Sequence, residues 1–382
     1  MLRVEEVHFN HDATSSVADA ITIRTNAGGS PIQAPEWRRG FAPLPAAYAA
    51  AALGATVTIR ARFTGGPPAG TRRIRAVDAY VPPAVPAGCL GWIFLVIARL
   101  IHALFGNVLG NVASHTVAFD AAGRSGLETM TLVGHKLKSA GVGIRTTEWK
   151  WQYRRGWRWT SFDTTQHRIY VVLDLPAGPW TQGAGNDTQL PWTDALDKAC
   201  LWAIGAKTKD EAAAAITQAV NSVPLQSYTP ATIFGFATYN LSSYLNQLKG
   251  GAPFQLNCTD CADAVTTFSN LVGCDLWEGR FFNMVTRRFL ALNGDPAVDA
   301  DWVSWMWNYH EISWLGAIAE SARVYDGCLQ LDMDDDDADL VHVARLPVKM
   351  TFGATDPDHY KYRLIASGPG NLENVPRRRS VA

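Results

Sequence analysis

The sequence contains little cysteine and little charge. Its 382 residues include six cysteines, 34 Lys or Arg and 35 Asp or Glu, for a formal net charge of -1. Six cysteines in a chain of this length are too sparse for a disulfide framework, so we expect reduced thiols. The near-neutral balance gives no electrostatic footprint for nucleic acid, despite the run Arg377, Arg378 and Arg379. We therefore expect no nucleic-acid partner.

Long apolar runs are also scarce. The opening MLRVEEVHFNHDATSS lacks the apolar stretch of a secretory signal, which favours a cytoplasmic protein. The longest candidate runs from Leu90 to Ala98, about half of the ~20 residues that span a bilayer, before Arg99 and His102 interrupt it. We expect a helix over 90–105, either covering a β-sheet or docking on a membrane or a partner.

The first half alternates apolar and polar residues with the period of a β-strand. This period occurs in ATVTIRARFTG, in EWKWQYR and in HRIYVVLDL, with Gly- and Pro-rich turns between the runs. We predict an antiparallel β-sandwich or barrel-like domain over 1–175, with the apolar helix as an insertion. The tryptophans of 148–162 favour core packing over a binding face, and His115, His135 and His167 favour packing over metal ligation.

The second half has a helical pattern. Gly and Pro dominate 176–192, which indicates a linker before a second domain over 193–365. Thr208 and Glu211 have the spacing of a capping box at a helix start. The overall prediction is an α+β protein with a disordered tail over 366–382.

One helix of this half begins with a thiol. The stretch CTDCADAVTTFSNLVGC starts at Cys258, with Asn257 as a plausible N-cap and Gly273 closing the helix. The positive end of a helix macrodipole favours thiolate over thiol, which makes a cysteine at this position a candidate nucleophile.

These residues carry a resemblance to a known family. The motif CTDCA at 258–262 resembles the nucleophile motif of transglutaminase-like proteins, which share the papain-like fold. His310 in YHEISW and Asp326 in RVYD are similar to the histidine and aspartate that complete the family's triad on two later strands. The resemblance covers about 190–350, and it implies a transglutaminase-like α+β domain that transfers acyl groups from amides.

The chemistry of a thiol nucleophile assigns roles to these residues. Cys258 would attack a carbonyl, a base such as His310 would take and return the proton, and Asp326 would orient that base. The backbone N–H of Cys258 and the side chain of Gln255 or Asn257 are candidate donors to an oxyanion.

The sequence leaves rivals for two of these roles. Cys261 repeats the Cys-x-Asp motif one helical turn later and is the alternative nucleophile. Asp332 is the alternative orienting group. The acidic run 332–339 favours a solvated loop over a calcium site.

Three other functional classes compete with catalysis. The CxxC of 258–261 is compatible with a dithiol redox centre, and Cys274 or Cys328 with a histidine would extend it to a zinc site. A catalytically inactive domain kept for binding is the third. We expect an enzyme that needs no cofactor or metal and hydrolyses a protein or peptide substrate, with protein crosslinking or deamidation as further outcomes. The sequence does not fix the oligomeric state.

Overall fold

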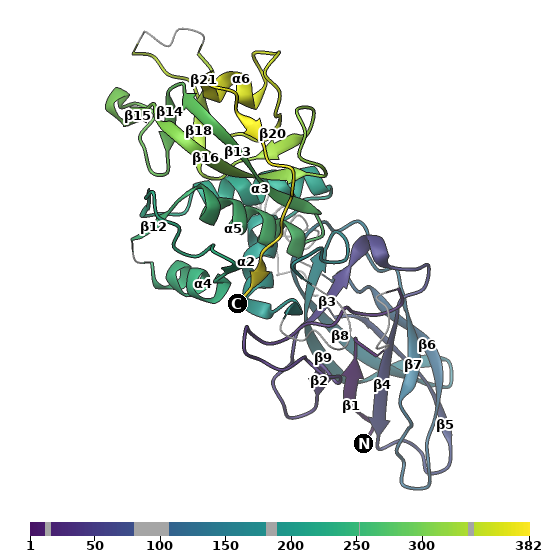
Figure 1. Cartoon of the computed structure of the whole chain (residues 1–382). Coiled ribbons are helices and arrows are strands. Elements are labelled where there is room, and N and C mark those ends of the chain that lie inside the picture. The colour runs from purple at the N-terminus through teal and green to yellow at the C-terminus, as the bar shows by residue number, and fades with distance from the viewer. Residues whose placement is uncertain (12–16, 80–106, 181–188, 252, 335–339) are drawn as a thin grey trace, which may run out of the picture. The chain divides into compact units, whose positions relative to one another are not determined.

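A computed structural model describes residues 1–11, 17–79, 107–180, 189–251, 253–334 and 340–382 (Figure 1). The protein is of mixed α+β class and divides into two compact units. Unit 1 comprises 1–175 with 182–207, and unit 2 comprises 176–181 with 208–382. The apolar segment 90–105 lies outside the described residues. In the described part of the chain, no helix has the length and apolarity to cross a bilayer.

The described residues of unit 1 form mainly strands, together with the short 3₁₀ turn η1 and the helix α2. Its elements are β1 (Arg3–His8), β2 (Trp37–Arg38), β3 (Ala46–Ala49), η1 (Ala50–Ala52), β4 (Thr58–Thr64), β5 (Thr71–Asp78), β6 (Asn111–Ala118), β7 (Glu128–Val133), β8 (Gly143–Arg155), β9 (Arg158–Val172) and α2 (Thr193–Trp202).

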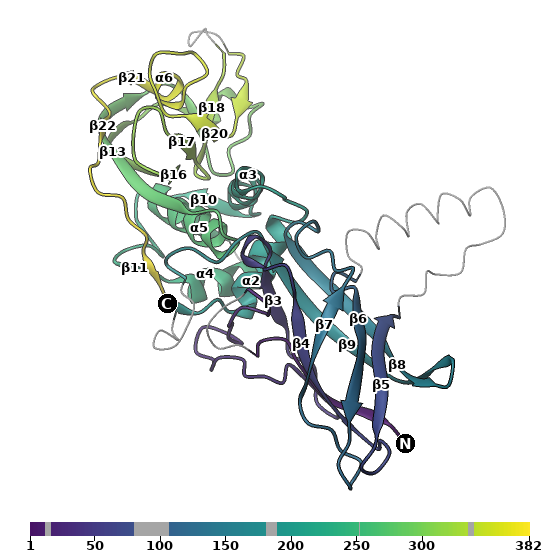
Figure 2. The ribbon, with the colours of Figure 1, turned by 90° about the vertical axis from the view of Figure 1, so that its right-hand side faces the viewer.

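These strands form one strongly curled sheet in the order β2-β1-β4-β7-β6-β5-β8-β9-β3 (Figure 2). The curl brings β1 against β9, where the Val4 N–H donates to the Asp163 carboxylate over 2.8 Å. We predicted an antiparallel β-sandwich or a barrel-like domain, and the structure has one strongly curled sheet, antiparallel except where β3 runs parallel to β9. The alternating residues predicted to face inward do so, since Trp149 and Trp151 are fully buried.

The helix α2 belongs to unit 1, where it packs on β8 and β9. We predicted that this segment opens the second domain, and the structure places it differently. Tyr170 on β9 donates a hydrogen bond of 2.5 Å to Asp197 of α2, and the buried face of the helix carries Ala195, Leu196 and Ala199. A helical periodicity in the sequence predicts which face of the helix is apolar, but it does not predict which part of the protein packs against that face.

Unit 2 combines helices with short strands. Its elements are α3 (Lys209–Asn221), β10 (Gln226–Tyr228), β11 (Thr238–Tyr239), α4 (Leu241–Gly250), β12 (Phe254–Leu256), α5 (Cys258–Leu271), β13 (Leu276–Thr286), β14 (Phe289–Ala291), η3 (Asp299–Asp301), β15 (Trp302–Val303), β16 (Met306–Leu315), β17 (Arg323–Tyr325), β18 (Leu329–Asp332), β19 (Ala344–Arg345), β20 (Val348–Thr351), α6 (Tyr360–Leu364), β21 (Ile365–Ser367), β22 (Asn371–Leu372) and β23 (Ser380–Val381).

The larger sheet of unit 2 has the order β20-β17-β16-β13-β21, and β22 also pairs with β13. Helix α5 packs against β13 and β16 in the middle of this sheet. A smaller sheet has the order β15-β14-β18-β19. The central strands therefore support the cysteine helix from one side.

Local capping signals define the predicted helix starts. The Thr208 side chain accepts a hydrogen bond from the Glu211 N–H at the start of α3. Asn257 caps α5, and Asp260 completes a reciprocal capping box there. These cap predictions are confirmed, because a cap depends on a few neighbouring residues and not on the distant fold.

The C-terminal tail is part of the fold. We predicted disorder over 366–382, and this is wrong for the structure. Strand β22 pairs with β13, β23 pairs in parallel with β11, and the Arg379 side chain is buried. The polar composition of the tail suggested disorder, but its arginines are held by carboxylates that are distant in sequence.

Candidate active site

The structure buries the whole of helix α5, on its polar as well as its apolar face. Two side-chain bonds fasten its polar face to β16. Thr259 donates to the Glu311 carboxylate over 2.8 Å, and the Thr266 and Ser313 hydroxyls lie 2.9 Å apart. Because buried polar groups require partners, these bonds fix how the helix lies on the sheet. Cys258 at its first turn is consequently held beside β16.

His310 on β16 and Asp326 after β17 come together in the buried layer. The two strands are antiparallel, and Ser313 lies opposite Tyr325. Because successive side chains alternate between the two faces of a sheet, the next residue, Asp326, has its side chain on the same face as His310. The His310 Nε2 lies 2.9 Å from Asp326 Oδ2, and both side chains are essentially inaccessible to solvent. The Cys328 N–H and the Tyr360 hydroxyl also donate to Asp326, over 2.8 and 2.7 Å.

Cys258 lies near the same imidazole. Burial alone would lower the pKa of His310, but the Asp326 carboxylate raises it, and the nearby Cys258 raises it further, to about 10. Within the described residues, His310 Nδ1 has no hydrogen-bond partner. The imidazole therefore bonds to a carboxylate and has a sulfur close by, an environment that favours its charged form.

The rivals for these roles are disfavoured for different reasons. The Cys261 side chain is 1% exposed, and burial raises the pKa of its thiol, which disfavours the nucleophilic thiolate. Asp332 accepts a bond of 2.6 Å from His342 Nδ1, whose ring lies against Trp302, so it does not orient His310. The structure thus brings together Cys258, His310 and Asp326, and separates Asp332 from them.

The candidate oxyanion donors differ in whether their hydrogen-bonding groups are already engaged. Asn257 is engaged as the cap, since its Oδ1 accepts from the Asp260 N–H and its Nδ2 donates to Thr232 over 2.8 Å. This overturns Asn257 as a donor. Gln255 on β12 is exposed, and the Cys258 N–H lies in the first helical turn, where backbone donors have no intrahelical partner.

Sequence reasoning missed the aromatic residues around the histidine. Trp307 stacks on the His310 ring with centroids 4.5 Å apart and planes 7° apart. Tyr228 lies near the sulfur: burial raises the pKa of its phenol, and the charge of Cys258 raises it further. The aromatic run WMWNYH before His310 was the available signal.

A buried charge cluster underlies the same site. The Arg379 guanidinium reaches Asp263 on α5 over 2.7 Å, Glu278 on β13 over 2.5 Å and Glu311 on β16 over 3.0 Å. Arg280 also binds Glu311, over 2.9 Å. One tail residue thereby joins the cysteine helix, the neighbouring strand and the residue that follows His310.

Three carboxyl groups around one buried guanidinium do not all ionise with equal ease. Burial raises the pKa of Asp263 well above its usual range, and the charge of Glu278 adds to this. Burial likewise raises the pKa of Glu278 to about 7. Burial would also raise the pKa of Glu311, but Arg379 and Arg280 lower it. Of the three, Asp263 therefore ionises least readily and Glu311 most readily.

Several arrangements for other chemistry are not found among the described residues. No cluster of three or more His, Cys, Asp or Glu side chains there has the arrangement of a metal site. The five cysteines that the structure describes are free thiols.

Comparisons with known proteins show a distant structural likeness. No family model matches the chain, and no curated protein does. Among solved structures, the chain is similar to the crystal structure of red sea bream transglutaminase, with 12% identity and a TM-score of 0.34. The alignment covers 77% of this chain and 50% of that one, so the chain spans about half the length of the fish protein.

We predict that Arg379→Met lowers the free energy of unfolding by about 3–5 kcal/mol, because it leaves buried carboxylates without their counter-charge. The neighbouring Arg378 is the matched control, since it binds the exposed Asp275 and stacks on Trp277. Arg378→Met should cost less than about 1 kcal/mol. Urea denaturation of the two variants measures both values, and equal losses would contradict the account of the cluster.

We also predict a pH dependence from His310. Its folded pKa of about 10 exceeds the ordinary 6.5, so its stabilisation is complete below pH 6.5 and is lost as the pH rises through 10. The stability difference between wild type and His310→Gln should shrink by on the order of 1 kcal/mol per pH unit between these limits.

Urea denaturation at pH 6.5, 8 and 9.5 measures this difference. His135→Gln is the control, because burial lowers the pKa of His135 and so moves its titration away from this window. Its stability difference from wild type should stay constant across the three values. A constant difference for His310→Gln would contradict the raised pKa.

Proposed function

We propose that the protein is a thiol-dependent enzyme that acts on amide bonds, with a transglutaminase-like catalytic domain within unit 2. The observation that carries the proposal is the buried His310, hydrogen-bonded to Asp326 through Nε2 and adjacent to the Cys258 thiol. A thiol, an imidazole and a carboxylate in this order supply a nucleophile, a base and an orienting group.

In the proposed mechanism, His310 takes the proton of the Cys258 thiol, the sulfur attacks the carbonyl carbon of an amide, and the carbonyl electrons move onto its oxygen. The tetrahedral intermediate collapses when the imidazolium of His310 donates its proton to the leaving amine. The C–N bond breaks, and a thioester to Cys258 remains. Water, deprotonated by His310, then attacks the thioester and releases the acid and the thiol.

The positioning of the imidazole follows from the contacts of Asp326. This carboxylate accepts three hydrogen bonds, from His310, Tyr360 and the Cys328 N–H, so it is itself fixed in position. A fixed acceptor holds the His310 ring through Nε2 and leaves Nδ1 without a partner among the described residues, and the stacked Trp307 restricts the rotation of the ring. The donors to the oxyanion are proposed to be the Cys258 N–H and the exposed Gln255 side chain.

Hydrolysis is the proposed reaction, with a protein or peptide as substrate and cytoplasm as location. An amine in place of water would give crosslinking, and a glutamine side chain as donor would give deamidation. None of these reactions requires a metal or an organic cofactor, because the nucleophile and the proton carrier are side chains of the chain itself.

One observation favours a second candidate, a binding protein without activity. The Cys258 side chain is only 5% exposed, so a substrate carbonyl needs a movement of the surrounding residues to reach the sulfur. If no such movement occurs, the same three residues serve only to stabilise the fold. Turnover separates the two candidates directly.

We predict that Cys258→Ala and His310→Ala each lower kcat by about 10⁴-fold or more, because nucleophile and base act as a unit. Asp326→Asn should retain more activity than either, since it alters only the orientation and charge environment of the ring. Cys261→Ala is the matched control one turn along the helix, and it should retain turnover.

The measurement is peptide release from casein and ammonia release from a glutamine-containing peptide, with a thermal melt of each variant. Folded Cys258→Ala with full activity would contradict the proposed nucleophile. Loss of activity in Cys261→Ala alone would move that role to the second cysteine. Absence of turnover in the wild type with both substrates would favour the binding protein.

A further inference from the structure

The longest hairpin of unit 1 ends in a basic and aromatic tip. Strands β8 and β9 extend beyond their neighbours in the sheet and meet at Gly156 and Trp157 (Figure 2). The Trp157 side chain is 93% exposed. Three arginines flank it in the sequence RRGWRW, namely Arg154, Arg155 and Arg158. A single exposed apolar residue is ordinary at a protein surface, so what sets Trp157 apart is the group of arginines around it.

The arginines of the tip face one another without acidic partners. In the hairpin register, Arg155 lies opposite Arg158, and like charges across a strand pair destabilise it. The segment 149–162 contains no Asp or Glu. In the ranges that the structure describes, no ion pair involves Arg154, Arg155 or Arg158.

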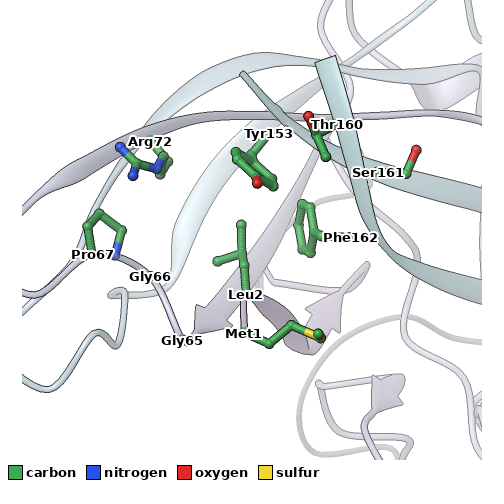
Figure 3. Close-up of a pocket in the computed structure, with 10 residues that line it drawn as sticks. All are labelled: Met1, Leu2, Gly65, Gly66, Pro67, Arg72, Tyr153, Thr160, Ser161 and Phe162. Carbon is green, nitrogen blue, oxygen red and sulfur yellow. The ribbon is translucent and has the colours of Figure 1, made fainter. Parts of the chain in front are cut away.

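The neighbouring strand β5 extends the positive charge. Arg73 and Arg75 bond to the neutral Ser114 and Gln152 side chains, so they too keep their net charge. A cavity of about 530 Å³ lies beside the hairpin, and Figure 3 shows Arg72, Tyr153 and Phe162 in its lining. Six arginines therefore gather around one end of β5, β8 and β9.

The two tryptophans nearest the tip, Trp157 and Trp159, have different surroundings. The Arg75 guanidinium covers the Trp159 ring at 4.1 Å from its centroid, and Trp159 is half-buried. Arg154 lies 5.9 Å from the Trp157 centroid and leaves that ring open to solvent. The tip thus presents one bare indole surrounded by cations.

We propose that this tip, defined as residues 154–158, docks the protein on a bilayer that contains anionic lipids. Indole rings partition to the boundary between headgroups and acyl chains, and arginines beside them reach lipid phosphates. A single exposed ring on a narrow convex turn fits a planar surface. Single-stranded nucleic acid instead needs a groove with several bases stacked on successive aromatic rings.

The test is flotation of the full chain with vesicles of phosphatidylcholine alone or with 20% phosphatidylserine. We expect binding only to the anionic vesicles, and weakening of it by salt. Each arginine near an anionic surface contributes about fivefold to binding. The triple variant Arg154→Gln, Arg155→Gln, Arg158→Gln should therefore bind about 100-fold more weakly.

A matched pair of double variants tests the site rather than the charge. Trp157→Ala with Arg154→Gln removes the tip contact, whereas Phe41→Ala with Arg38→Gln removes an exposed aromatic and cation pair elsewhere in unit 1. Only the first should lose vesicle binding. Both should keep the wild-type circular dichroism melt, because all four side chains lie at the surface.

Two results would overturn the proposal. One is the absence of wild-type binding to anionic vesicles, or binding that the tip variants leave unchanged. The other is tighter binding of a single-stranded oligonucleotide than of the vesicles, measured by fluorescence anisotropy and lost in the same variants. That result would assign the tip to nucleic acid instead of lipid.

Discussion

The candidate site depends on the complete burial of a helix that carries many polar side chains. Most of these find partners on the surrounding elements. Thr259 and Thr266 bond to β16, Asp260 accepts the N–H groups of Phe234 and Gly235 at 2.7 and 2.9 Å, and Asn270 donates to the Leu276 carbonyl. A helix held by such directional bonds has one position on the sheet, because a shift would leave buried groups unsatisfied. That position places Cys258 beside His310.

The charge cluster of Arg379 also fixes the position of helix α5 on the sheet, because it joins α5 to β13 and β16. A buried ion pair adds little to the free energy of folding, whereas breaking it leaves an unpaired buried charge at a large cost in stability. The cluster therefore acts mainly by destabilising other arrangements of these elements. Glu311 is the shared residue: it bonds to Thr259, next to the nucleophile, and it follows His310 on β16. The neighbours of the proposed nucleophile and base are therefore joined directly, which supports the pre-organised geometry that thiol catalysis requires.

Much of the candidate site could be predicted from local signals in the sequence. The parts that depend on contacts between residues distant in the sequence could not. The capping residues around Cys258 lie within three positions of one another, so the helix start could be predicted from them. His310 and Asp326 were predicted from the resemblance of their two strands to those of transglutaminase-like proteins. Arg379 was missed because its partners are more than 60 residues away and its own segment is polar. Asp332 was a credible rival until the partner of its carboxylate, His342, was known.

The most direct test of the account is the rate at which iodoacetamide alkylates each cysteine of the native protein at pH 7, read by mass spectrometry. Burial raises the pKa of Cys200 and of Cys274 to about 12, so both should react slowly. Cys258 should react much faster, and His310→Ala should remove most of that advantage. Equal rates for the three thiols, or a Cys258 rate that His310→Ala leaves unchanged, would contradict the pairing of Cys258 with His310.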